Sequence, residues 1–212
     1  MVTGDLVLTE DEVNPVISRL QDGGVEQSAL HNHLLDETPR VMYMHLMARG
    51  DAARLARTIH AALATTKTPL APPSRVATPL RLDMDTMIAA RVLGHAGTVT
   101  NGVYQVGVPR PEKIHDGGME IPPSMGVATG INIQPTDATR AVATGDFVLL
   151  ASQVNPVIRA LRANGIAITA LHSHMLGESP RLFFMHFWAQ DSTAKVLAGL
   201  RAALNAAGQG PR

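Results

Sequence analysis

Six of the nine histidines of this chain fall in two short stretches that share one pattern. Each stretch holds a His-x-His pair, a Glu four residues later, a Pro-Arg pair and a third His. Neutral imidazole suits zinc, copper, iron and nickel, so three histidines on one surface could hold a metal ion. The candidate ligands are His31, His33 and His45 in the first stretch, and His172, His174 and His186 in the second.

The residues around each histidine group predict a β-hairpin. Both flanks are rich in Leu, Val, Met and aromatic residues. The Asp-Glu-Thr-Pro or Gly-Glu-Ser-Pro between them is typical of a loop of about four or five residues. Residues two apart on a strand share a face. With the turn centred on Thr38, we expect His31 to face His45 and His33 to face Tyr43. The second hairpin repeats the pattern.

Further side chains in the two stretches could take part in chemistry. Glu37 and Glu178 could each be a fourth ligand, a partner of a ligand, or a catalytic acid or base, and a solvated turn carboxylate is the simpler explanation. The arginines could steer an anionic substrate or pair with the turn acid, and the aromatic rings could line a pocket or belong to the core. These candidate substrate residues are Arg40, Tyr43, Arg181, Phe184 and Trp188.

A packed, hydrogen-bonded histidine is the alternative for any single member of these groups. Three protonated imidazoles so close together would repel one another, which favours a metal or a buried acid beside them. Zinc is the first candidate cofactor, and iron, nickel and copper are the others. Copper would be favoured by methionines that faced the site, but strand alternation points Met44 and Met185 away from it.

Composition excludes several classes of protein. The 212 residues include 45% hydrophobic and 17% charged residues, which allows a buried core. Lys plus Arg and Asp plus Glu are balanced at 18 each, so a basic nucleic-acid interface is not expected. There is no cysteine, so any metal is held by histidines and carboxylates. No apolar run is long enough for a membrane span, and no signal peptide is visible. We expect a cytoplasmic protein if Met1 is the native start, and an exported form stays open.

The two stretches belong to an internal repeat with an offset of 141 residues. At that offset, Thr3–Ala48 and Thr144–Ala189 agree at 23 of 46 positions. The repeated unit reads as strand, helix, strand, strand, helix, with closing helices at Asp51–Ala64 and Ser192–Ala206. This order predicts an α+β fold with antiparallel sheets and helices on one face, related by a pseudo-twofold axis. The histidines should line the other face.

Three domain segments follow from this pattern. They are a first repeat unit at 1–66, a proline-rich linker at 67–80 and a second, complete unit at 81–208. The second unit has extra elements, with a helix at Asp83–Leu93 and strands between Gly102 and Gln134. The first unit has no counterpart of them, so we expect it to be shortened at its N-terminus. Its first strand would then be an uncovered edge, which predicts a homodimer.

The run GDLVLTEDEVNPV, the run ALHNHLLDETPRVMYMH and their copies resemble the bacterial LppY/LpqO family of domains of unknown function. The resemblance covers most of the chain and implies no particular reaction. Separately, the spacing of His31, His33 and Glu37 is similar to the first metal motif of cupins. Helices interrupt the strands here and the third His follows within one hairpin, which suggests a similar ligand set on another fold.

Two functions follow from these patterns. One is a metal-dependent enzyme that acts on a small organic molecule, such as a hydrolase, lyase or oxygenase, with a metal-bound water in the open position. The other is a protein that binds a metal or small ligand without turnover. A purely structural role for the imidazoles is a third reading. Because both stretches keep every His, two sites are expected.

Overall fold

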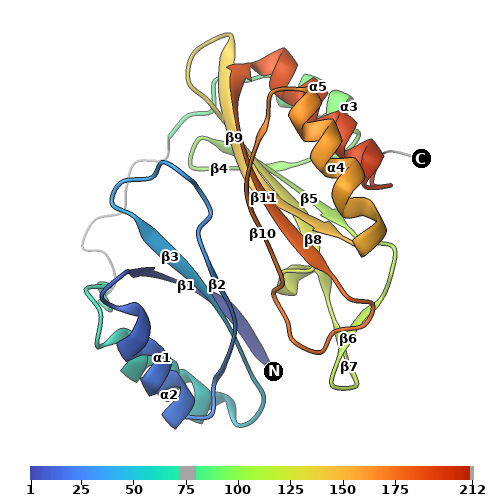
Figure 1. The fold of residues 1–212 in the computed structure, drawn as a ribbon. Coiled ribbons are helices and arrows are strands. Elements are labelled where there is room, and N and C mark those ends of the chain that lie inside the picture. The colour runs from blue at the N-terminus through green and yellow to red at the C-terminus, as the bar shows by residue number, and fades with distance from the viewer. Residues whose placement is uncertain (72–79, 211–212) are drawn as a thin grey trace. The chain divides into compact units, whose positions relative to one another are not determined.

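The computed structural model describes residues 1–71 and 80–210 (Figure 1). Most of the predicted linker, at 72–79, lies outside the described residues. The chain divides into two compact units. Unit 1 consists of Met1–Ala77 with the short segment Ser173–Leu176, and unit 2 consists of Thr78–His172 with Gly177–Arg212. Antiparallel sheets with helices packed on one face confirm the predicted α+β class.

Unit 1 is a three-stranded antiparallel sheet with two helices on one face (Figure 1). The sheet order is β1-β3-β2, so β1 and β2 are its edges. Leu8, Val16 and Met44 are fully buried between sheet and helices. In chain order the elements are β1 (Val2–Thr9), α1 (Val13–Asp22), β2 (Glu26–His31), β3 (Val41–Ala48) and α2 (Ala52–Leu63).

Local chemistry sets the helix boundaries of unit 1. The Glu12 carboxylate accepts hydrogen bonds from the backbone N–H groups of Thr9 and Lys67, at 2.9 and 2.8 Å. Glu12 therefore ties the entry of α1 to the segment after α2. Gly24, with φ of +71°, takes the left-handed conformation that follows α1. Asp51 caps α2 by accepting from the N–H of Arg54 at 2.8 Å.

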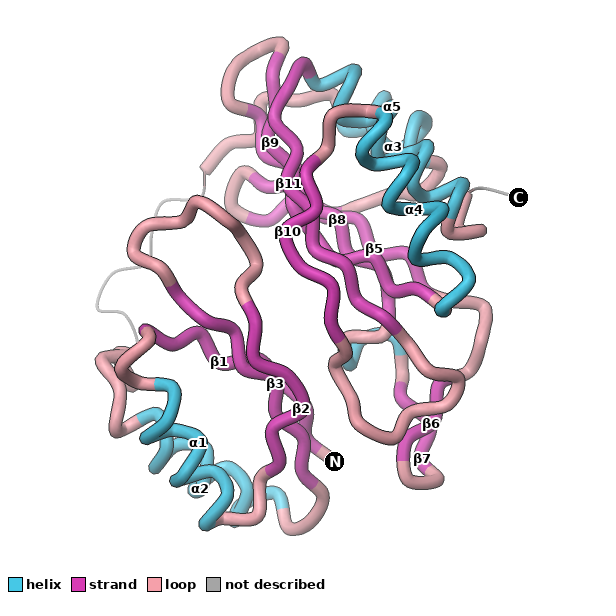
Figure 2. The backbone as a smooth tube through the Cα atoms, in the orientation of Figure 1, coloured by secondary structure: helices cyan, strands magenta, loops and turns pink. Residues whose placement is uncertain are grey.

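Unit 2 has a larger sheet, with strand order β10-β11-β9-β8-β5-β4. Its three α-helices lie on one face of that sheet, and the small hairpin β6–β7 lies at one end of the unit (Figure 2). In chain order the elements are α3 (Thr86–Leu93), β4 (Thr98–Thr100), β5 (Val103–Pro109), β6 (Ile114–Asp116), β7 (Met119–Ile121), a 3₁₀ turn (Pro123–Met125), β8 (Ala128–Pro135), β9 (Arg140–Leu149), α4 (Ala151–Ala163), β10 (Ala167–His172), β11 (Phe183–Ser192) and α5 (Thr193–Ala206).

Both units use the same strand pairing at the offset of 141 residues. The order β1-β3-β2 in unit 1 matches β9-β11-β10 in unit 2. Asp5 pairs with His45, and Asp146 pairs with His186. The register irregularity of the first hairpin lies between Gln27 and Ala29, and that of the second lies between Ile168 and Ala170.

The hairpin loops are longer than predicted. β2 ends at His31 and β3 begins at Val41, so a turn of four or five residues was wrong. The Asn32 side chain donates to the backbone carbonyl of Leu34 at 2.9 Å, a local bond that competes with strand pairing. Pro39 offers no N–H to a ladder.

The register within the first hairpin also differs from the prediction. His31 pairs with Tyr43 instead of His45, and Ala29 pairs with His45. The difference is two residues, and a shift by two keeps every side chain on its predicted face. The helix-facing residues of β3 belong to the apolar core, among them Met44 and Leu46. The histidines therefore lie on the sheet face opposite the helices, as predicted.

Candidate metal centre

Unit 1 brings together all three histidines of the first stretch. One ring nitrogen from each of His31, His33 and His45 lies within 4.8 Å of the others, a spacing that could hold one metal ion. The His31 ring centroid is 5.1 Å from that of His33 and 4.9 Å from that of His45. His31 and His45 come from paired strands, and His33 comes from the loop that follows β2.

Asp5 fixes the orientation of one of these rings. It lies directly across from His45 on β1, and its carboxylate binds His45 Nδ1. A carboxylate only accepts, so Nδ1 carries the proton and the lone pair of the neutral ring is on Nε2. A carboxylate behind the outer nitrogen of a ligating histidine is the usual arrangement in metal sites.

The charges around Asp5 also show how the cluster is balanced. Burial raises the pKa of the Asp5 carboxyl, but the hydrogen bond to His45 and the nearby imidazoles outweigh it, so the net pKa is lowered. Asp5 is therefore an anion beside the histidines. Sequence reasoning missed this residue, although the Gly-Asp pair recurs at Gly145-Asp146 and alternation from the core residues Leu6 and Leu8 places Asp5 on the histidine face.

Tyr43 and Glu37 border the same cluster. The Tyr43 ring stacks on His33 with centroids 3.4 Å apart. Burial, followed by the negative charges of Glu37 and Asp5, raises the pKa of the Tyr43 phenol. Tyr43 is thus a neutral hydrogen-bond donor at physiological pH. The Glu37 Oε1 atom is buried and accepts no hydrogen bond from the described residues.

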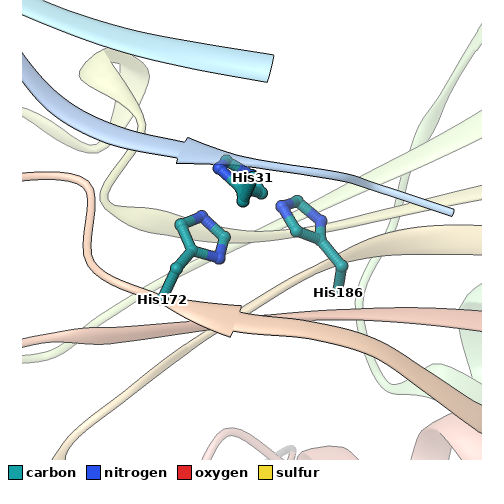
Figure 3. Close-up of side chains that lie close together, drawn as sticks. All are labelled: His31, His172 and His186. Carbon is teal, nitrogen blue, oxygen red and sulfur yellow. The ribbon is translucent and has the colours of Figure 1, made fainter. Parts of the chain in front are cut away.

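Unit 2 holds two histidines of the second stretch close together. His172 ends β10 and His186 lies on β11, and their rings stack with centroids 4.9 Å apart (Figure 3). His186 Nδ1 donates to the Gly145 carbonyl oxygen at 3.0 Å, whereas Asp146 Oδ1 lies 4.0 Å away. The lone pair of the neutral His186 ring is again on Nε2, but a carbonyl takes the place of the carboxylate.

The third histidine of the second stretch lies in the other compact unit. His174 belongs to the segment Ser173–Leu176 of unit 1, where its ring centroid is 3.8 Å from that of His45. In the same unit the Ser28 hydroxyl donates to the His174 backbone carbonyl. The two stretches are therefore distributed differently between the units, although their sequences match.

The second candidate acid, Glu178, is engaged in its own loop. Its side chain is fully buried, and it accepts from the Leu182 N–H at 3.0 Å and from Arg181 Nη1 at 3.2 Å. The neighbouring Ser179 pairs through its backbone with His115 of the hairpin β6–β7. These contacts give Glu178 a role in holding the loop, unlike Glu37.

The remaining candidate substrate residues differ in exposure. Arg40 and Arg181 are exposed, the latter next to Glu178. Phe184 is fully buried, with its ring centroid 6.1 Å from that of His172. Trp188 is half-buried at the start of the β10–β11 ladder. Of the aromatic candidates, Tyr43 and Phe184 contact histidines of the predicted ligand set.

Comparison with known proteins gives a family. Residues 1–65 and 88–206 match the model of a family described as Domain of Unknown Function (DUF1259). The chain belongs to this family. The predicted membership of a family of unknown function is confirmed, and the name LppY/LpqO stays an expectation. None of the curated proteins matches the chain.

One solved structure shares a weak likeness with the chain. It is described as a double-ringed trimeric shell protein from the RMM microcompartment. The identity is 10% and the TM-score 0.25, over 99% of this chain and 83% of the other. A score that low supports no inference about fold, assembly or function. Separately, no helix among the described residues is long and apolar enough to cross a membrane.

Proposed function

We propose that the protein is a metal-dependent enzyme that acts on a small organic molecule, with its centre at His31, His33 and His45 of unit 1. The observation that carries this proposal is the convergence of three ring nitrogens within 4.8 Å, with Asp5 behind one of them. Three neutral imidazoles satisfy three positions of a tetrahedral zinc and leave one for water or substrate. Zinc is the first candidate, and iron, nickel and copper are the others.

Neighbouring groups supply the functions that such a centre needs. A metal-bound water would have its pKa lowered toward about 7 on zinc and could act as a nucleophile or base. Glu37, with a buried oxygen that accepts no hydrogen bond from the described residues, is the candidate base or fourth ligand. Tyr43, whose phenol is protonated at neutral pH and whose pKa is raised further by burial, could donate a hydrogen bond to a substrate oxygen. Arg40 could attract an anionic group from the exposed rim.

The alternative is a metal-binding protein without turnover. The engagement of Glu178 by Leu182 and Arg181 favours it for the second stretch, because that carboxylate already holds its loop. His172 and His186, with Asp146 nearby, would then contribute to metal binding alone.

We also propose that the two matching units arose by duplication and that the protein forms a homodimer.

Metal content tests the proposal. Tag-free protein should retain zinc or another divalent transition metal by elemental analysis after dialysis against metal-free buffer. The His33→Ala variant should lose at least one metal per chain. The matched control is His115→Ala, an exposed histidine of β6 that should leave the stoichiometry unchanged. Equal metal content in wild type and His33→Ala would contradict the proposal.

Cobalt substitution separates the two functions. Co²⁺ in an open site should change its visible spectrum when azide or another small anion is added, because the anion takes the vacant position. A site whose coordination positions are all filled by protein ligands would show no spectral change, which would favour a protein that binds the metal without turnover. Comparing Glu37→Gln with wild type in this assay shows whether that carboxylate occupies the fourth position.

A further inference from the structure

The outer edge of β1 is an open edge of the unit 1 sheet. β1 pairs with β3 on one side, and no strand among the described residues pairs with its other side. Its counterpart β9 pairs on that side with β8 in antiparallel orientation. Val2–Thr9 contains no Pro, Lys or Arg, and its one charged residue, Asp5, is bound to His45 of the same unit, so β1 has little of the usual protection of a strand edge. The edge is therefore competent to pair with another strand.

A pair of matching glycines shows what kind of neighbour this edge fits. A Cβ on Gly145 of β9 would clash with the backbone carbonyl of Gly130 on β8, so close approach of that strand requires a glycine. A Cβ on the matching Gly4 would meet nothing within 4 Å. Gly4 does not have a left-handed φ either. Unit 1 thus keeps the glycine that strand approach requires, with no strand beside it among the described residues.

The exposed side of α2 also lacks the neighbour that its counterpart in unit 2 has. In unit 2 the counterpart helix α5 is covered by α3, and Leu197 and Leu200 are buried in that core. Arg201 Nη1 of α5 donates to the carbonyls of Val92 and Leu93 at the end of α3. No described helix covers the matching side of α2.

Instead, α2 borders an apolar cavity of about 530 Å³. Ala56 and Ile59, the counterparts of Leu197 and Leu200, line it together with Val2 of β1. None of the lining side chains is Asp, Glu, Lys or Arg. At the cavity, therefore, two copies can meet without like-charged side chains opposing each other, which a twofold interface requires because each patch faces itself.

We propose that the edge of β1 and the exposed side of α2 form a homodimer interface with a second copy of this chain. Two β1 strands would pair antiparallel about a twofold axis and join two three-stranded sheets into one of six strands. Each α2 would then lie beside its symmetry mate on the helix-covered face and fill the apolar cavity. The second copy would supply the two kinds of neighbour that β8 and α3 supply in unit 2, namely an antiparallel strand and an apolar helix.

Solution mass tests this interface. Light scattering of wild-type protein at micromolar concentration should give twice the 22.5 kDa of one chain. Ala56→Glu should weaken the dimer by about a hundredfold or more, because it would bury an unpaired carboxylate at the interface. Ala61→Glu is the matched control, since Ala61 is also exposed on α2 but does not line the cavity. It should remain dimeric.

A second variant tests the strand edge separately. Gly4→Ala has room within one chain and should fold with unchanged circular dichroism, yet weaken the dimer through the crowding seen at Gly145. A wild-type mass of 22.5 kDa would mean that something other than a second copy covers this surface, and it would overturn the proposal. A dimer that withstands both Ala56→Glu and Gly4→Ala would overturn it equally. Metal content is independent of these outcomes.

Discussion

At the scale of single residues, the two central histidines of β3 and β11 differ in what holds their Nδ1 atoms. His45 is bound by the Asp5 carboxylate, and His186 donates to the Gly145 carbonyl with Asp146 at 4.0 Å. A carboxylate increases the basicity of the imidazole and fixes its orientation more strongly than a neutral carbonyl does. We therefore expect the two positions to differ in their importance for metal binding.

The first prediction concerns Asp5. Asp5→Asn should lower zinc affinity by about 10- to 100-fold, since a carboxylate behind a ligating histidine has that effect on metal affinity. Competition with a chromophoric chelator would measure it. Asp146→Asn is the matched control at the same place in the repeat, and its effect should be smaller because His186 keeps its bond to a backbone carbonyl. Equal losses in both variants would contradict the assigned role of Asp5.

At the scale of elements, the entry to α1 depends on one carboxylate. Glu12 accepts from the N–H groups of Thr9 and Lys67, and these backbone hydrogen bonds lower its pKa. Because the pKa of Glu12 is lower in the folded state, its carboxylate stabilises the fold fully at pH values above 4.5, the pKa of this group in the unfolded chain. This stabilisation is lost as the pH falls through the lower pKa of the folded state.

The second prediction follows from that linkage. Glu12→Gln should reduce the free energy of unfolding by on the order of 1 kcal/mol at pH 7, and the difference from wild type should shrink below pH 4.5. Urea denaturation at several pH values would measure it. Glu10→Gln, at an exposed position two residues earlier, should behave like wild type throughout. A Glu12→Gln deficit that stays constant down to pH 3 would be inconsistent with this role.

The third prediction uses the matching glycines. Gly145→Ala places a methyl group against the Gly130 carbonyl and 3.1 Å from the Ile131 Cα, so β8 and β9 must separate. We expect a loss of about 1–3 kcal/mol in the free energy of unfolding, as for other overpacked sites. Gly4→Ala should cost far less in a dilute, monomeric sample. Chemical denaturation of both variants at low protein concentration measures the contrast, and equal stabilities would refute it.

At the scale of the whole molecule, sequence patterns predicted the α+β class and the face of the sheet that carries the histidines, because both signals are local. Strand alternation placed the histidines opposite the helices, and apolar periodicity placed the closing helix of unit 1 at Asp51–Ala64, close to the observed Ala52–Leu63. One of the errors was non-local. The partner of His45 is Asp5, on a strand forty residues away, and hairpin spacing cannot identify it. The length of the loops was misjudged because the turn residues extend over most of 32–40.

The division of the second histidine group was also beyond sequence reasoning. Its three members match those of the first group position for position, yet His174 lies with unit 1 while His172 and His186 lie in unit 2. Compact units form from contacts across the whole chain, and an identical local pattern does not determine which unit a short loop segment joins.

The most direct test of the metal centre is a crystal structure with zinc located by anomalous scattering. We predict a peak in unit 1 within about 2.0–2.1 Å of one nitrogen each from His31, His33 and His45, with Asp5 still bound to Nδ1 of His45. Data collected on both sides of the zinc absorption edge would identify the metal. An anomalous map with no peak among these three rings, from protein soaked in zinc, would contradict the account.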